Sequence, residues 1–307
     1  MSTLAPRRLA LVTAVYPGVE TFLGAWHRSV LAQEDGDVDL WIACDGIDPA
    51  HVVEVLGVDP GAHWVRASPG DTPAQVRQRV LERVVERYDA VVLVDSDDLL
   101  HPSRVAAARR RLATSDLSAC ALRLVDERGH DLGATLVLPT GAAPDDVLPR
   151  TNIYGLSNSA YRCELLRRCL PIPAAARAVD WFLATRAWLS RARLDVDPVA
   201  RMDYRQHGAN MTCVLPPFDA AQLRRDTPMV AAHVAQLISA TGERPDTARL
   251  AALVAMAADI EAFSRRVVGD DERLERYLRR LSDLAPAPLW WVHVAHPALR
   301  ALWQDDV

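Results

Sequence analysis

Three carboxylates stand within four residues, directly after the most apolar stretch of the first half of the chain. Residues 90–94 read AVVLV, and residues 95–98 read DSDD. Carboxylates this close repel one another unless a cation lies among them, and Mg²⁺ or Mn²⁺ binds one or two carboxylates together with substrate phosphates. The spacing therefore predicts a cation–phosphate site. The alternative is a helix N-terminus, in which Ser96 or Asp98 caps the helix expected after Pro102.

Two further carboxylates begin or end predicted elements. Asp45 follows the apolar stretch 39–43, where it can accept hydrogen bonds from a base or a ribose; the alternative is a simple turn, because Asp-Gly is a common turn dipeptide. Asp180, in AVDWFLATRAW, begins a helix candidate. Its alternative is an acidic residue that the helix dipole favours.

A third polar cluster, YRQHGANMT, covers residues 204–212. Its arginine, Arg205, can pair with phosphate through a planar guanidinium. Its histidine, His207, can bind a metal or a phosphate. A structural role for the histidine is equally open at this point.

The elements that must position these residues alternate between strand and helix. Apolar runs predict buried parallel strands, and stretches with helical spacing separate them. This order predicts a parallel sheet flanked by helices, with ligands bound beyond the carboxyl ends of the strands, where both acidic loops lie. The strands are expected at 9–15, 39–43, 62–66 and 90–94, and the helices at 20–32, 73–88 and 102–112.

From residue 118 the pattern changes. Paired strands are expected on either side of a turn, followed by a proline-rich loop, two helices and a strand. After Pro216-Pro217 the chain is rich in Ala, Arg and Leu, which favours helices. We therefore expect a first domain over residues 1–215 and a helical extension over 216–307. The expected elements are strands 120–125 and 132–138, loop 139–151, helices 161–170 and 180–190, strand 195–204, and helices 228–239, 247–267 and 271–284.

Composition excludes several functional classes. The chain has 307 residues, is 50% hydrophobic and carries a net charge of −5, which argues against disorder and against a nucleic-acid binder. All 35 basic residues are arginine, so mechanisms that need a lysine, such as a Schiff base or a Walker A loop, are excluded. The five cysteines form no CxxC. With neither a signal sequence nor a membrane-spanning run expected, the predicted location is the cytosol, with peripheral contact to the membrane as an option.

Taken in order, segments across residues 9–213 resemble glycosyltransferase family 2. The matching segments are 13–16 (TAVY), 29–33 (S-x-x-x-Q), 44–46 (CDG, at the position of DDGS), 75–78 (QVRQ), 94–98 (VDSDD, the DxDD signature), 126–129 (DERG), 158–162 (NSAYR), 179–181 (VDW, at the Glu-Asp pair) and 204–210 (YRQHGAN).

The resemblance implies the GT-A fold, a Rossmann-like mixed and mostly parallel sheet between helices. It also implies an inverting transfer of a sugar from a nucleoside-diphosphate donor to an acceptor hydroxyl, with Mn²⁺ or Mg²⁺, in polysaccharide or glycoconjugate synthesis. The acceptor would be a glycan, a lipid-linked glycan or a small molecule.

The resemblance also implies roles for individual residues. Asp180 would be the general base that deprotonates the acceptor. Asp97 would bind the metal, with His207 as a further metal or diphosphate contact. The implied donor-binding residues are Thr13, Val15, Asp45, Arg77, Asp95, Ser96 and Arg205.

Four positions depart from the family pattern. Cys44 and Ile47 replace Asp and Ser of DDGS, Gln78 replaces Asn, and Val179 replaces Glu. These departures leave open a sugar-nucleotide-binding scaffold without activity. A nucleotidyltransferase is a further alternative, although that chemistry relies on lysines and on a glycine-rich first loop.

The helices after residue 216 lie outside the resemblance. They are candidates to cover the acceptor, to form a homodimer or to contact a membrane. Residues 289–296 (LWWVHVAH) have the tryptophans of an interfacial segment but little basic charge, which favours docking against protein.

Overall fold

The computed structural model describes residues 4–208, 210, 214–240 and 246–304. The chain divides into two compact units. The first comprises residues 1–138 and 154–207, and the second comprises residues 139–153 and 208–307. None of the helices in the described ranges has the length and apolar character needed to cross a bilayer.

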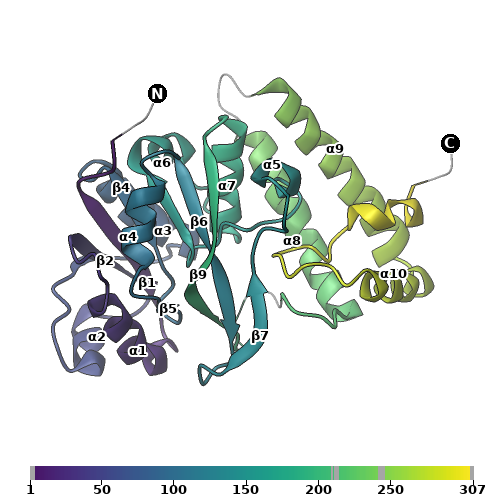
Figure 1. The fold of residues 1–307 in the computed structure, drawn as a ribbon. Helices are drawn as coiled ribbons and strands as arrows, with labels where there is room; N and C mark the ends of the chain where they lie inside the picture. Colours follow the sequence, from purple (N-terminus) through teal and green to yellow (C-terminus); the bar gives the residue numbers. More distant parts are fainter. Residues whose placement is uncertain (1–3, 209, 211–213, 241–245, 305–307) are drawn as a thin grey trace. The chain divides into compact units, whose positions relative to one another are not determined.

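A mixed sheet forms the centre of the first unit (Figure 1). Its strands in the described residues are β1 (Leu9–Val15), β2 (Val38–Cys44), β3 (His63–Arg66), β4 (Ala90–Leu93), β5 (Leu99–Leu100), β6 (Leu117–Val125), β7 (Asp131–Leu136), β8 (Ser159–Arg162) and β9 (Leu194–Arg205). The strand order is β3-β2-β1-β4-β8-β6-β9-β5, and β7 pairs with β6. Strands β1 to β4, β6 and β9 run in one direction, because β8 is antiparallel to both β4 and β6 while β9 is parallel to β6. The predicted mixed, mostly parallel sheet is confirmed.

Local sequence signals explain the elements that surround the site. All seven residues of β1 and all four of β4 are buried, as expected for strands covered on both faces. Helix α3 begins with a capping box, in which the Thr72 side chain accepts from the Gln75 backbone and Pro73 follows the cap. The helices of this unit are α1 (Glu20–Leu31), α2 (Pro49–Leu56), α3 (Pro73–Val85), α4 (Arg104–Arg111), α6 (Cys163–Cys169) and α7 (Val179–Leu189).

The order of the first four strands brings their carboxyl ends together. Helices α1 and α2 lead the chain outward from β1 to β3, and α3 leads it back to β4. Because such crossovers are right-handed, the outward and returning helices cover opposite faces of the sheet. Val15 at the end of β1 is in register with Cys44 at the end of β2, and Val12 with Leu93 of β4. The loops after these strands therefore meet at one edge.

The second unit is helical. Its described elements are α5 (Pro144–Val147), α8 (Ala220–Ser239), α9 (Thr247–Phe263), a π-helical turn (Ser264–Val268), α10 (Asp271–Leu284) and a 3₁₀ helix (Pro297–Leu302). Helix α8 begins well before Pro228, so the predicted start at that residue is wrong. The side chain of Asp219 caps the helix by accepting from the Gln222 backbone, and Pro228 lies inside it at an exposed position.

Other elements also differ from the sequence predictions. The expected helix 161–170 begins as strand β8 and becomes helical only at Cys163. The loop 139–151 contains α5 and belongs to the second unit. Helix α2 was not predicted, although Asp48 caps it and Gly57 ends it with a positive φ of 69°.

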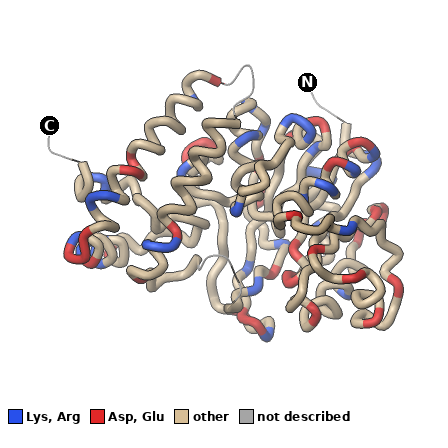
Figure 2. The backbone as a smooth tube through the Cα atoms, turned by 180° about the vertical axis from the view of Figure 1, so that it is seen from behind, with Lys and Arg blue, Asp and Glu red and all other residues tan. Residues whose placement is uncertain are grey.

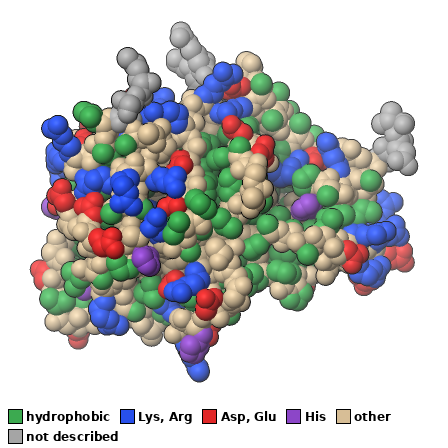
Figure 3. Space-filling view, in the orientation of Figure 1, with side chains coloured by type: hydrophobic (Ala, Val, Ile, Leu, Met, Phe, Trp, Pro, Cys, Tyr) green, Lys and Arg blue, Asp and Glu red, His purple; other side chains and the backbone are tan. Residues whose placement is uncertain are grey.

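Charged residues are distributed unevenly over the helices. Figure 3 shows arginines gathered over α4, whose last turn holds residues 109–111, where the helix dipole favours cations. Residues 250–258 in the middle of α9 carry no charge, and this part of the helix is therefore tan throughout in Figure 2. The described helices therefore differ in their charge: α9 has an uncharged middle, whereas α10 carries charged residues along its length.

Candidate active site

The acidic loop, residues 95–98, follows β4, and its innermost carboxylate is that of Asp98. Asp98 is 1% exposed. Its carboxylate accepts hydrogen bonds from the Arg205 backbone N–H, at 2.7 Å, and from the Ser157 hydroxyl. Burial and the neighbouring carboxylates raise the pKa of Asp98 well above its ordinary value. Asp98 therefore anchors the loop from within.

Ser96 ties the same loop to the first strand. It is fully buried, and its hydroxyl donates to the Ala14 carbonyl at 2.7 Å. The N-cap of α4 is Ser103. The alternative in which Ser96 or Asp98 caps that helix is therefore wrong, because both side chains bond elsewhere. A donor contact by Ser96 stays a prediction.

Asp97 presents its carboxylate to two side chains. The Tyr16 phenol donates to Oδ2 at 3.1 Å, and Nε2 of His207 lies 3.0 Å from the same oxygen. Only 13% of the Asp97 side chain and 10% of the His207 side chain are exposed. Burial and the nearby Asp97 charge raise the pKa of Tyr16 above its ordinary value, so the phenol stays neutral and donates.

Arg205 joins the acidic loop to the turn between β6 and β7. Its guanidinium donates from Nε to the Asp97 carbonyl and from Nη1 to the Glu127 carbonyl, both at 2.7 Å. It also lies 4.8 Å from the centroid of the Phe22 ring, and that ring is 5.2 Å from the imidazole of His207. The cluster predicted at 204–212 thus contacts the acidic loop through its first half, whereas residues 209 and 211–213 lie outside the described residues. Phosphate binding by Arg205 stays a prediction.

Asp95 is the most open carboxylate of the loop, with 29% of its side chain exposed. Nη2 of Arg77 lies 3.9 Å from its Oδ1, and the Ser157 hydroxyl lies 3.3 Å from its Oδ2. Burial raises the pKa of Asp95 to about 7; the charges of Asp97 and Asp180 add to the rise, and Arg77 opposes it. One distant guanidinium therefore compensates this carboxylate only in part.

Asp180 lies in the first turn of α7 and is half-buried. Its charge contributes to the raised pKa of Asp95, and also to that of Tyr161, which is raised chiefly by burial. The structure therefore brings Asp180 close to the acidic loop, as its predicted role requires. That role, general base, stays a prediction.

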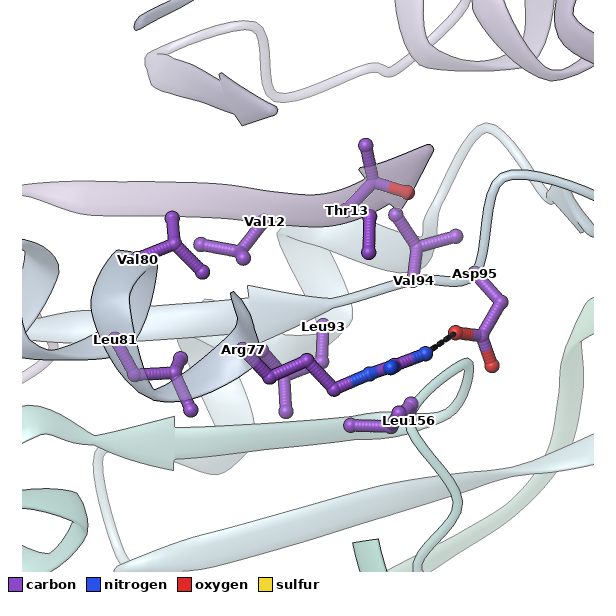
Figure 4. Close-up of a pocket in the computed structure, with 10 residues that line it drawn as sticks. Val12, Thr13, Arg77, Val80, Leu81, Leu93, Val94, Asp95 and Leu156 are labelled. Atoms are coloured by element: carbon purple, nitrogen blue, oxygen red, sulfur yellow. Dashed lines mark ion pairs between the residues drawn. The ribbon is translucent and has the colours of Figure 1, made fainter. Parts of the chain in front are cut away.

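An apolar pocket opens beside Asp95 (Figure 4). Its enclosed part is small, about 20 Å³, and the rest of the hollow is open to solvent. Figure 4 shows Arg77 reaching from α3 toward Asp95 across the pocket. The Thr13 hydroxyl is buried and has no hydrogen-bond partner among the described residues. Apolar walls with a few polar groups are typical of a small-molecule site. The lining residues are Val12, Thr13, Ala14, Arg77, Val80, Leu81, Leu93, Val94, Asp95 and Leu156.

The end of β2 adjoins this region through its backbone. The Val15 carbonyl, at a fully buried residue, accepts from the Asp45 N–H at 2.9 Å. Gly46 has a φ of +73°, and a Cβ placed there would lie 3.6 Å from the Pro17 ring, so the loops after β1 and β2 are in contact. Asp45 itself is half-buried. Burial raises the pKa of the Cys44 thiol to about 11, so Cys44 supplies no carboxylate-like charge.

The candidate metal ligands of the site suit a cation that a substrate also binds. Within the described ranges, no group of three or more His, Cys, Asp or Glu side chains is arranged to hold a metal on its own. Asp97 and His207 do form a pair of adjacent candidate ligands. Mg²⁺ is usually bound by one or two carboxylates plus substrate phosphates, and Mn²⁺ suits similar oxygen ligands.

Three contributors to the site were not singled out from the sequence. Tyr16 and Phe22 flank His207 and Asp97, and Ser157 bonds to both Asp95 and Asp98. Tyr16 and Ser157 fall in or beside segments of the family resemblance, which is the one signal that pointed to them. Their partners are 59 to 81 residues away in the chain.

Comparison with known proteins identifies the type of fold. No family model matches the sequence, and no curated protein matches it. S. aureus TarS 1–349 in complex with UDP-GlcNAc has a TM-score of 0.54 and 15% identity, over 90% of this chain and 80% of that one. The mannosyltransferase PcManGT from Pyrobaculum calidifontis, in complex with GDP-Man and Mn²⁺, has a TM-score of 0.53 and 16% identity, over 98% and 88%.

In a longer TarS structure the match has a TM-score of 0.51, and the chain spans 44% of that protein's length. At these identities the likeness concerns architecture. The chain has a GT-A-type glycosyltransferase fold.

Proposed function

We propose that this chain is an inverting glycosyltransferase that moves a sugar from a nucleoside-diphosphate donor to an acceptor hydroxyl, with Mn²⁺ or Mg²⁺. The observation that carries the proposal is an apolar pocket at the carboxyl edge of the sheet that is lined by Asp95, a carboxylate on which the charges of Asp97 and Asp180 act. Two proteins with the same type of fold have bound nucleotide sugars: TarS 1–349 binds UDP-GlcNAc, and PcManGT binds GDP-Man and Mn²⁺. A fold alone does not determine a function, so the assignment rests on the side chains of the site.

The donor would bind with its nucleoside over the open mouth of this pocket. Thr13 offers a buried hydroxyl, and Asp95 offers carboxylate oxygens to a ribose or a base. Asp45 at the adjacent strand end would contact the base, and Arg77 would face the diphosphate. Asp97 and His207 would hold the cation, which supplies charge stabilisation for the leaving diphosphate.

Asp180 would accept the proton of the acceptor hydroxyl. As that proton leaves, the acceptor oxygen forms a bond to the anomeric carbon, and the bond from this carbon to the diphosphate oxygen breaks. The position of Asp180 in the first turn of α7 stabilises its ionised form through the helix dipole. A well-placed base of this kind accelerates a reaction by about 10²–10⁴-fold.

We assign this chemistry to the first domain, expected at residues 1–215, and contacts with the acceptor or with a partner to the helices after it. Both assignments are separable by experiment, because every residue placed in the site above lies in the first compact unit.

The test is a binding and turnover screen of the full chain. UDP- and GDP-sugars are added with Mn²⁺ or with EDTA, thermal unfolding reports binding, and release of nucleoside diphosphate is measured over a panel of acceptors. We expect a metal-dependent rise in the unfolding temperature, since donor at 100 times its Kd adds about 2.7 kcal/mol of stability. Binding without product on any acceptor would indicate a scaffold, and pyrophosphate release from a nucleoside triphosphate and a sugar phosphate would indicate a nucleotidyltransferase. Absence of binding to all donors would contradict the proposal.

A further inference from the structure

We infer that Tyr16 couples donor binding to cation binding, by occupying Asp97 until a donor displaces it. Tyr16 is then a positioning residue that acts through Asp97. The inference rests on the proposed function, because it concerns the order in which that site is filled.

The carboxylate oxygen that Tyr16 contacts is already saturated. Oδ2 of Asp97 lies 3.1 Å from the Tyr16 hydroxyl and 3.0 Å from Nε2 of His207. A carboxylate oxygen has about two lone-pair sites, so these two groups fill it. A cation that uses this oxygen must displace one of them. Because His207 would itself bind the cation, the phenol is the group that a cation would displace from this oxygen.

Buried side-chain hydrogen bonds anchor the acidic loop, whereas the loop after β1 is exposed at its tip. Ser96 and Asp98 anchor the acidic loop through buried hydrogen bonds to Ala14 and to Arg205. Tyr16 is half-buried and precedes two exposed residues, Pro17 and Gly18. Motion that separates the phenol from Asp97 therefore falls on the residues after β1.

A donor would reach this loop from two sides. Thr13, in the pocket, lies three residues before Tyr16 on β1. Pro17, directly after Tyr16, contacts Gly46, and Gly46 follows Asp45. A nucleoside that contacts both Thr13 and Asp45 would therefore also contact the segment that carries the phenol. By linkage, whatever the donor does to cation affinity, the cation does equally to donor affinity.

The substitution Tyr16→Phe keeps the ring and removes the hydroxyl. Without donor, we expect Mn²⁺ to bind the variant about tenfold more tightly, because a hydrogen bond to a charged group no longer competes. With UDP or GDP present, we expect equal Mn²⁺ affinity in wild type and variant, so that the coupling between the two ligands is about tenfold smaller in the variant. Tyr16→Leu should change donor-free affinity in the same direction.

The measurement is a titration of Mn²⁺ into the full chain, followed by the electron paramagnetic resonance of free Mn²⁺, with and without UDP or GDP. Tyr88→Phe is the matched control, because the Tyr88 hydroxyl also donates to a carboxylate, Asp39 at 2.7 Å, and is part of the same unit. Circular dichroism verifies that each variant is folded.

Unchanged or weaker donor-free Mn²⁺ binding in Tyr16→Phe would overturn the inference. If wild type binds Mn²⁺ with a nucleoside diphosphate and releases product, that result would leave the proposed function standing. If wild type binds no Mn²⁺ even with UDP and GDP, both the inference and the metal-dependent function fall. A tenfold gain in the control as well would also overturn it, since the effect would not be specific to Asp97.

Discussion

Asp259 in the second unit and Asp97 in the first unit have partners that differ in kind. Asp259 on α9 has a fully buried side chain and accepts from Arg150 at 2.9 Å, from Arg300 at 3.0 Å and from the Trp303 indole at 2.9 Å. Asp97 in the acidic loop has a phenol and an imidazole as partners, and 13% of its side chain is exposed.

The difference separates a structural carboxylate from one prepared for a ligand. Two guanidinium groups and an indole N–H satisfy Asp259, and they join α9 to segments on both sides of it in the sequence. Asp95 has one guanidinium at 3.9 Å, and burial raises its pKa to about 7. A buried charge that its own protein leaves partly uncompensated is costly, and such groups concentrate at functional sites.

The substitution Asp180→Asn gives the largest expected effect. We expect transfer to fall by about 10²–10⁴-fold, because the acceptor proton loses its base, while donor affinity stays within a factor of a few. Steady-state rates and calorimetric donor binding measure the two quantities. The control is Glu164→Gln, since Glu164 is also in the first turn of a helix, α6, but is exposed. Near-normal turnover in Asp180→Asn would show that the base lies elsewhere.

The substitution Asp259→Ala tests whether Asp259 stabilises the fold. We expect the free energy of unfolding to fall by about 3 kcal/mol, because removing one partner of a buried ion pair leaves the others unmatched. Arg150 and Arg300 are 24% and 48% exposed, so water relieves part of the cost. Denaturant unfolding monitors the change. A loss below about 1 kcal/mol would remove the contrast with Asp97.

The substitution Asp97→Asn tests whether Asp97 binds a cation rather than stabilising the fold. We expect Mn²⁺-dependent donor binding to weaken by at least about tenfold, because a cation loses its anionic ligand, while the free energy of unfolding changes by less than about 1 kcal/mol. Calorimetric titration of a donor with and without Mn²⁺ distinguishes these effects. Unaltered Mn²⁺ dependence in this variant would exclude Asp97 as a ligand.

The sequence predicted the parts of the molecule that local signals determine. Strand β1 is a continuous apolar run and was predicted to the residue; the start of α3 at Pro73 was also predicted, whereas its end lies three residues before the predicted one. The resemblance to glycosyltransferases placed Asp95, Asp97 and Asp180 in one site; in the structure the charges of Asp97 and Asp180 act on Asp95, and their roles stay predictions. Helix α8 was misjudged because Pro228 resembles a helix start, whereas its cap lies nine residues earlier at Asp219.

Long-range partnerships could not be predicted from local patterns. Tyr16 meets Asp97 across 81 residues, and Ser157 meets Asp98 across 59. The contact of Ser157 lies directly before β8, a four-residue strand that enters the sheet between β4 and β6. A strand so short, continuing directly into α6, has no periodicity of its own to reveal it.

The smallest expected effect concerns a buried histidine of the second unit. Burial lowers the pKa of His233 to about 3, against about 6.5 in an unfolded chain. The folded state therefore favours the neutral ring, so the stability from this group is complete above pH 6.5 and is lost as the pH falls toward 3. Between pH 7 and pH 5 this amounts to about 2 kcal/mol.

Denaturant unfolding of wild type, His233→Leu and the exposed control His51→Leu at pH 7, 6 and 5 measures this dependence. The curve for His233→Leu should be flatter by about 2 kcal/mol, and that for His51→Leu should parallel wild type. Parallel curves for all three proteins would show that His233 does not act through its charge. A flatter curve would place His233 beside Asp259, among the buried polar groups of the second unit that serve stability, in contrast to the carboxylates of the acidic loop.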